Sequence, residues 1–186
     1  MKKWIALFSH TGREIAEVSN RLGVEPYRIV CNKRADDPEI CEDLDGITFV
    51  SKTPSITDYD AIFEEDTIIT MHGWMRVIPA EICEKYNILN LHPGLITTYP
   101  ELKGKDPQKK VFDMLNPPSR VGCVIHEASA ELDSGKVLME RSVTNTFPSA
   151  EILTTYLHRM SWDMWVDFLP IYAGIRSEEE NDQTME

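Results

Sequence analysis

Short apolar runs alternate with amphipathic segments through the first half of the chain, and no other feature limits the possible folds so strongly. Strands are predicted over residues 4–8, 27–32, 47–51, 66–74 and 87–92. Helices are predicted between them, over residues 13–23, 36–46 and 79–87. Such alternation is typical of βαβ units, and strands that are apolar throughout fit a mostly parallel sheet with both faces covered.

The second half of the chain predicts an extension of this sheet. After a helix over residues 106–115, two strand-like runs, 121–129 and 136–143, are joined by the short turn AELDSGK, which favours an antiparallel hairpin. A long helix follows over residues 149–175, with Ser149 as its N-cap. The expected fold is therefore a three-layer, Rossmann-like α/β domain. It combines a twisted, mostly parallel sheet with an antiparallel hairpin extension and a long C-terminal helix.

Length and charge narrow the class of protein. Residues 1–176 are predicted to form one domain, and the acidic segment 177–186 is predicted to be a disordered tail. The net charge of −12 argues against a broad nucleic-acid or anionic-membrane surface. No apolar run reaches membrane-spanning length, and no signal peptide is recognised. We expect a cytoplasmic protein that binds neither nucleic acid nor membrane and exists as a monomer or homodimer.

The cysteines and histidines predict no metal site. Four widely separated cysteines form no CxxC or Cys/His zinc pattern, and free thiols are expected at Cys31, Cys41, Cys83 and Cys123. No two of the five histidines have a metal-binding spacing on one predicted face. His126 is predicted to be structural.

Polar residues gather where the predicted strands end. The four clusters are residues 9–14, 72–76 and 90–92, and residues 129–133 in the hairpin turn. Ligands of open α/β sheets bind beyond the carboxyl ends of the strands, so these four loops are expected to converge on one binding edge. Each cluster taken alone is equally compatible with an ordinary polar loop.

Asn90, His92 and Asp133 form the group with the clearest chemistry. A carboxylate beside an imidazole fixes its tautomer and raises its pKa, and an imidazolium with an amide can stabilise an oxyanion. No serine or cysteine nucleophile lies at this edge, so direct acyl transfer to an amine fits best. By spacing alone, turn and strand-end roles for the same three residues are as well supported.

Two motifs carry a resemblance that decides between these interpretations. LNLHPGLI, followed some forty residues later by GCVIHEASAELDSGKVL, resembles the folate-dependent formyltransferase family. Within that family the chain is most similar to glycinamide ribonucleotide transformylases. The resemblance implies that Asn90, His92 and Asp133 are catalytic. The amide and the protonated imidazole would hold the oxyanion, and the carboxylate would raise the pKa of the imidazole.

A third motif implies a binding site for the formyl donor. GWMRVIPAEICEKYN resembles the family segment that cradles the pterin ring of the folate. The co-substrate implied is 10-formyltetrahydrofolate, without a metal. The residues expected to bind it are Met75, Arg76, Val77, Ile78, Asn90, Ser129 and Glu131.

The loop after the first strand departs from the family pattern. Glycinamide ribonucleotide transformylases have Gly-x-Gly-Ser-Asn there and hold the substrate phosphate with its backbone amides. Here the stretch is SHTGRE, in which Gly12 is retained while Arg13 and Glu14 replace the Ser and Asn. These three residues are expected to bind the acceptor, and Glu14 would oppose a phosphate unless its side chain points away.

The expected activity is formyl transfer to the primary amine of a small phosphorylated acceptor. Glycinamide ribonucleotide, an intermediate of de novo purine biosynthesis, is the leading candidate. The alternatives are an amino-sugar nucleotide as the acceptor, and hydrolysis of the formyl folate by water.

Overall fold

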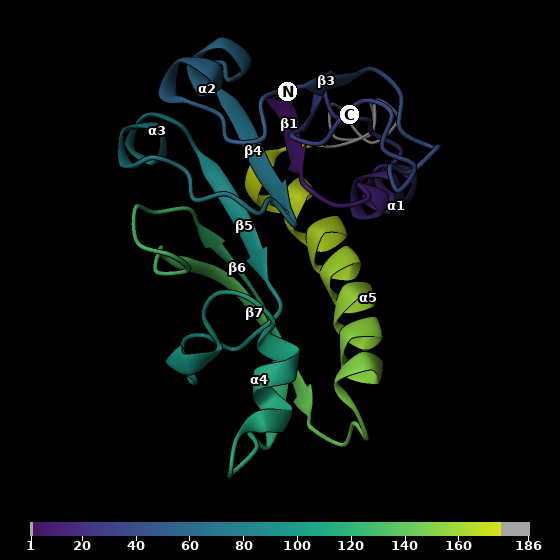
Figure 1. Cartoon of the computed structure of the whole chain (residues 1–186), viewed down its shortest axis with the longest axis vertical. Helices are drawn as coiled ribbons and strands as arrows, with labels where there is room; N and C mark the ends of the chain where they lie inside the picture. The colour runs from purple at the N-terminus through teal and green to yellow at the C-terminus, as the bar shows by residue number, and fades with distance from the viewer. Residues whose placement is uncertain (1, 176–186) are drawn as a thin grey trace, which may run out of the picture.

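The apolar runs build a seven-stranded sheet in the order β3-β2-β1-β4-β5-β6-β7 (Figure 1). The computed structural model describes residues 2–175, so the predicted tail at 177–186 lies outside the described residues. The strands are β1 (Lys3–Phe8), β2 (Arg28–Cys31), β3 (Ile47–Phe49), β4 (Thr67–His72), β5 (Ile88–His92), β6 (Arg120–Glu127) and β7 (Val137–Thr144). The first five are parallel, whereas β6 runs antiparallel to β5 and pairs with β7 as a hairpin. The predicted fold class is confirmed.

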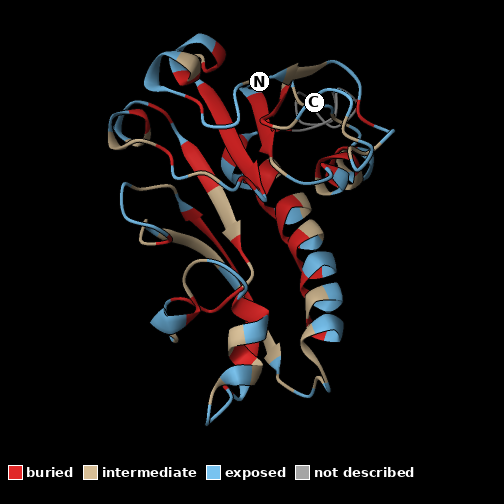
Figure 2. Cartoon of the chain, in the orientation of Figure 1, coloured by how far each residue is buried: buried red, intermediate tan, exposed pale blue. Residues whose placement is uncertain are grey.

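Helices cover both faces of this sheet. They are α1 (Arg13–Leu22), α2 (Ile56–Ile62), α3 (Ala80–Lys85), α4 (Pro107–Asp113) and α5 (Ala150–Phe168), with a short 3₁₀ turn, η1 (Pro100–Leu102). Alternate β1 side chains enter two separate cores, Trp4, Ala6 and Phe8 on the side of α1 and α5, Ile5 and Leu7 on the side of α2 and α3. Figure 2 shows β1 and β4 buried along nearly their whole length, which fits the apolar run of β1 after Lys3; the polar Thr67, Thr70 and His72 of β4 are buried as well.

Two local predictions in the first half are wrong or incomplete. Residues 36–46 form turns instead of a helix. Six of these eleven residues are acidic, and the Asp37 carboxylate accepts hydrogen bonds from the Glu39 N–H and from Lys33. Such side-chain bonds compete with helix formation. Helix α2 was not predicted, although Ser55 and Asp58 form a capping box at its start.

The C-terminal helix begins as predicted but ends earlier. The Ser149 side chain caps α5 by accepting from the Ile152 N–H, at 3.4 Å. The regular helix ends at Phe168, and a wider π-type turn, η2 (Leu169–Ala173), follows. Pro170 has no N–H to continue the helical hydrogen bonding, which accounts for the change. No helix in residues 2–175 is both long and apolar enough to cross a membrane.

A close backbone crossing at Gly135 positions the turn that carries Asp133. A Cβ atom added to Gly135 would lie 1.7 Å from the carbonyl oxygen of Glu127, so only glycine fits there. Asp133 itself has a positive φ of 49°, a left-handed conformation that aspartate tolerates better than most residues. These two residues fold the turn back over the end of β5.

Gly135→Ala should open the β6–β7 turn and move Asp133. We expect a loss of about 2 kcal/mol of unfolding free energy from the backbone clash. The imidazole NMR resonances of His92, which Asp133 contacts, should shift as well. Gly122→Ala is the matched control, because its Cβ would lie 2.0 Å from the Arg141 carbonyl oxygen on the same hairpin. It should cost similar stability and leave the His92 resonances in place; equal shifts in both variants would contradict the assignment.

Candidate active site

Asn90, His92 and Asp133 come together at the end of β5. Asn90 and His92 are two residues apart on one strand, so their side chains share a face of the sheet. Asp133 reaches them from the β6–β7 turn, with its Oδ2 3.2 Å from His92 Nδ1 and its Oδ1 3.5 Å from Asn90 Nδ2. The contact between residues 41 positions apart in sequence is the one that the sequence pattern required.

His126 joins this group, although the sequence analysis assigned it a structural place. It pairs with Asn90 across the antiparallel β5–β6 ladder. Its Nε2 lies 3.1 Å from Asn90 Nδ2 and 3.6 Å from Asp133 Oδ1, while its Nδ1–H donates to the Glu127 carbonyl at 2.9 Å. The one signal available was the hairpin itself, whose antiparallel pairing brings a β6 residue opposite Asn90.

The Asp133 carboxylate is buried and strongly favours its ionised form. Burial alone would raise its pKa, but the hydrogen bond with His126, the nearby His92 imidazole and the Gly104 N–H lower the pKa to about 2. The Gly104 amide donates to Oδ2 at 2.7 Å. The side chain is only 6% exposed, so this charge is held by partners rather than by water.

His92 is enclosed more completely than the sequence suggested. Its ring is buried, and its Nε2–H donates to the carbonyl of Leu102 at 2.9 Å. Burial lowers the pKa of His92, and the Asp133 carboxylate opposes this shift without reversing it. The prediction that the pKa of His92 is raised is therefore wrong overall. The carboxylate does raise it, but the cost of desolvating the imidazolium is larger.

Asn90 is the accessible member of the three. It is half-buried, whereas His92 and Asp133 are buried behind it. Its amide nitrogen faces His126 and Asp133, which fixes the orientation of the amide group. Both N–H groups of the amide are therefore directed at partners inside the site, and the amide can donate to a bound group only by exchanging one of them. An amide backed by an imidazole and a buried carboxylate can in this way contribute to stabilising a developing negative charge.

The segment after β4 exposes apolar side chains, as a ring-binding loop would require. Met75 and Val77 are exposed, while Ile78 packs into the core between the sheet and α3. The Arg76 guanidinium donates to the carbonyls of Lys52 and Met75, both at 2.7 Å, and so braces the loop. The Met75 N–H donates to Ser9 Oγ at 2.9 Å, which ties this loop to the one after β1.

Ser129 and Glu131 lie in the turn that also carries Asp133. The Ser129 hydroxyl donates to the Glu131 carbonyl at 2.7 Å, so its observed role is to shape that turn. The Glu131 side chain is exposed.

The loop after β1 keeps its glycine and turns Glu14 inward. Gly12 has φ 73°, and an added Cβ would lie 2.4 Å from Leu44 Cδ1, so another residue is strained there. Glu14 Oε2 lies 2.8 Å from His72 Nδ1, and Ser161 Oγ–H donates to Oε1. Burial alone would raise the pKa of Glu14, but the bonds to His72 and Ser161 lower it. Arg13 is exposed, so of the three predicted acceptor residues it alone presents its side chain to solvent.

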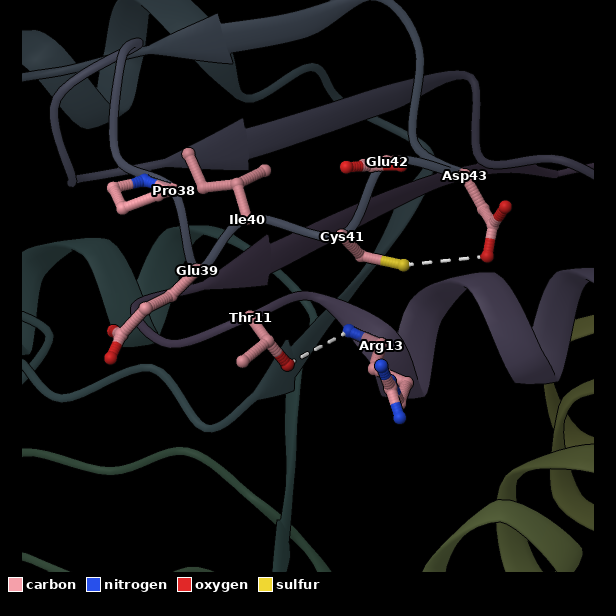
Figure 3. Close-up of a pocket in the computed structure, with 8 residues that line it drawn as sticks. All are labelled: Thr11, Arg13, Pro38, Glu39, Ile40, Cys41, Glu42 and Asp43. Carbon is pink, nitrogen blue, oxygen red and sulfur yellow. Dashed lines mark hydrogen bonds between the residues drawn. The ribbon is translucent and has the colours of Figure 1, made fainter.

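A cavity of about 330 Å³ opens beside this loop, and neither Asn90 nor His92 is among the residues that line it (Figure 3). Its walls come from the β1 loop and from the turns after β2: Thr11, Arg13, Pro38, Glu39, Ile40, Cys41, Glu42 and Asp43. The lining contains three carboxylates, those of Glu39, Glu42 and Asp43, and one guanidinium, that of Arg13, which makes this wall unfavourable for a phosphate. Within residues 2–175, no group of three or more His, Cys, Asp or Glu is placed to hold a metal ion.

Comparison with known proteins shows a match between this sequence and a protein family. The sequence model described as "Formyl transferase" matches residues 51–159. Phosphoribosylglycinamide formyltransferase of Dictyostelium discoideum is 28% identical over 109 residues, 52% of this chain and 50% of that protein. The match thus spans about half the length of that curated relative.

Solved structures share the fold at low sequence identity. Phosphoribosylglycinamide formyltransferase from Streptococcus pneumoniae has a TM-score of 0.76 at 17% identity, over 91% of this chain and 97% of that one. Glycinamide ribonucleotide transformylase 1 from Symbiobacterium toebii gives 0.74 at 19%, over 94% and 88%. A sugar N-formyltransferase from a Shewanella species gives 0.67 at 20%, over 90% and 68%.

Asp133→Asn should destabilise the protein in a pH-dependent way. The folded-state pKa of about 2 lies below the ordinary value of 3.8, so the ionised group stabilises the fold above pH 3.8. This contribution is lost as the pH falls through 3.8 toward 2. The shift corresponds to about 2 kcal/mol.

Urea unfolding of both proteins tests this. The difference in unfolding free energy should be close to its full value at about pH 6 and shrink by roughly half at about pH 3. Asp163→Asn is the control, since Asp163 forms an exposed ion pair with Arg21 and should show a small difference throughout. A difference for Asp133→Asn that stayed constant with pH would contradict the assignment.

Proposed function

The chain belongs to the formyl transferase family, whose sequence model matches more than half of its residues, and we propose that it transfers a formyl group from 10-formyltetrahydrofolate to a primary amine. The observation that carries the proposal is the buried Asp133 carboxylate, which contacts the His92 and His126 imidazoles behind the accessible amide of Asn90. The same three residues, Asn90, His92 and Asp133, are the ones that the family motifs implied.

In the proposed reaction the substrate amine attacks the formyl carbon, and the formyl oxygen becomes negatively charged. The Asn90 amide, the accessible member of the group, donates a hydrogen bond to this oxygen by exchanging its contact with His126 or Asp133 for the new acceptor. His92 supplies positive charge and a proton from behind, with Asp133 as its counter-ion. For His92 to donate to the oxygen directly, its Nε2–H must exchange the Leu102 carbonyl for the new acceptor. Collapse of the intermediate breaks the bond between the formyl carbon and N10; N10 takes up a proton as it leaves and the attacking nitrogen loses one, so the products are the formamide and tetrahydrofolate.

The donor is proposed to lie against the loop after β4. The exposed Met75 and Val77 offer an apolar surface for the ring. Ser129 and Glu131, on the turn that carries Asp133, are proposed to meet another part of the donor. The braced Arg76 supports the loop rather than reaching for a ligand.

Glycinamide ribonucleotide is the proposed acceptor. Its support is the curated Dictyostelium relative, which carries that activity in its name, together with the retained Gly12 turn and the inward direction of Glu14. With Glu14 turned away, the exposed Arg13 guanidinium can meet a phosphate, whereas the Arg13 backbone N–H already donates to Thr11 Oγ1 at 3.2 Å. The rival acceptor, an amino-sugar nucleotide, is favoured by the loss of the loop Ser and Asn and by the likeness to a sugar N-formyltransferase.

A transfer assay with the purified protein and 10-formyltetrahydrofolate tests the activity and separates the acceptors. Formation of tetrahydrofolate is followed by absorbance with glycinamide ribonucleotide, with an amino-sugar nucleotide, and with no acceptor. We expect turnover that requires glycinamide ribonucleotide. Turnover only with the amino-sugar nucleotide would make that compound the acceptor in place of glycinamide ribonucleotide. Turnover without any acceptor would indicate hydrolysis of the formyl folate. No turnover in any of the three assays would overturn the proposal.

Asn90→Ala should lower kcat by about 10²-fold or more, the scale for loss of one oxyanion donor. Stopped assays under saturating donor give the value, and the unfolding free energy should change little because Asn90 is half-buried. Asn87→Ala is the matched control, an exposed asparagine just before β5, and should keep normal turnover. An Asn90→Ala protein with wild-type kcat would remove the amide from the mechanism.

A further inference from the structure

We infer that Glu14 and His72 are positioning residues, whose contact fixes the loop after β1 relative to the loop after β4. The inference rests on the proposed function only for the substrates assigned to these loops, the acceptor to the first and the formyl donor to the second. The contact itself belongs to a buried polar chain that the proposed chemistry does not use.

The series of hydrogen bonds runs through four elements of the fold. The Trp4 indole N–H donates to Thr70 Oγ1 at 2.7 Å, and Thr70 Oγ1 lies 2.8 Å from His72 Nε2. His72 Nδ1 lies 2.8 Å from Glu14 Oε2, and Ser161 of α5 donates to the other carboxylate oxygen. Strands β1 and β4 and helices α1 and α5 thus meet at one carboxylate.

Because they are buried, these hydrogen-bonded side chains depend on one another for their partners. The His72 side chain is fully buried, Ser161 is buried, and the Glu14 side chain is 21% exposed. A carboxylate so placed is stable only with hydrogen-bonding partners, and removal of one partner leaves the others unsatisfied. The geometry is therefore held firmly, which is what a positioning role requires.

The two partners sit at the roots of the two loops. Glu14 follows the Gly12 turn by two residues, and His72 directly precedes Gly73, which has φ 69°. The strands are in register, with Phe8 beside His72, so the loops leave the sheet side by side. A Cβ on Gly73 would lie 3.2 Å from the His10 ring, which shows how closely the loops pass.

A second bond offers a readout of the spacing between the two loops. The Met75 N–H donates to Ser9 Oγ at 2.9 Å, so this bond also joins the loop after β1 to the loop after β4. If the Glu14–His72 contact fixes the spacing, its loss should weaken the Ser9–Met75 bond. The amide of Met75 should then exchange its hydrogen with solvent faster, because exchange follows local opening.

The test compares Glu14→Gln, His72→Gln and the double variant with wild type by amide hydrogen exchange. Each single substitution should speed exchange at Met75 by at least about tenfold relative to Ile69, a buried β4 amide bonded to the Asn87 carbonyl. The double variant should be no faster than the singles, because both residues act through one contact. Glu17→Gln is the matched control, a carboxylate of the same helix paired with exposed Arg21, and should leave Met75 unchanged.

The outcomes separate a positioning role from a purely structural one. Equal acceleration at Met75 and Ile69 reports general destabilisation and overturns the inference, as does unchanged exchange at Met75. If the buried variants do not fold, Ser161→Ala removes one bond to Glu14 and should give a smaller, still selective increase, whose absence would also overturn it.

Kinetics then connects the contact with the proposed function. Both single variants should raise the KM of donor and acceptor about fivefold or more while lowering kcat less, since the reacting groups on β5 are untouched. A rise confined to one substrate, or a loss in kcat alone, contradicts the link. A wild-type protein without formyl transfer would defeat the proposed function, whereas the exchange experiment would still decide the positioning role.

Discussion

The buried carboxylate of Asp133 connects separate stretches of the chain at the end of β5. It contacts His92 at the end of β5, His126 on β6, and the amide of Gly104 in the segment between η1 and α4. Each partner comes from a different stretch of chain, and all of them face a charge that water cannot reach. Because an unpaired buried carboxylate is costly, the hairpin turn, the strand end and the loop are stable only in this arrangement.

The same burial decides which groups of the site are ionised. Burial lowers the pKa of His92, whereas contacts with His126, His92 and the Gly104 N–H lower the pKa of Asp133. The site therefore favours a charged carboxylate more than a charged imidazole. An oxyanion formed near Asn90 would add negative charge close to His92 and raise its pKa. Within the proposed mechanism, proton uptake by the imidazole accompanies formation of the oxyanion, and the desolvated pair makes that coupling strong.

How much the sequence could predict depends on whether a feature is set locally or by a distant contact. The strands were predictable because two covered faces demand apolar residues, and Asn90, His92 and Asp133 because motifs place them. Residues 36–46 were not, since their acidic side chains bond the backbone and break the helix. His126 depended on the register of an antiparallel pair, and the direction of Glu14 depended on His72, 58 positions away. No local pattern encodes either contact.

The two polar groups of the site lie on opposite faces of the sheet. Trp4, Thr70 and His72 point to the side of α1 and α5, whereas Asn90 follows Ile88 on the side of α2 and α3. Met71 and Asn90 are neighbours in the β4–β5 ladder, so one strand spacing separates the groups. Since the sheet lies between them, the Glu14–His72 contact can act on the reaction only through the loops that it anchors. Under the proposed function, one face of the sheet would carry the reacting groups and the other would hold the loops that place the substrates.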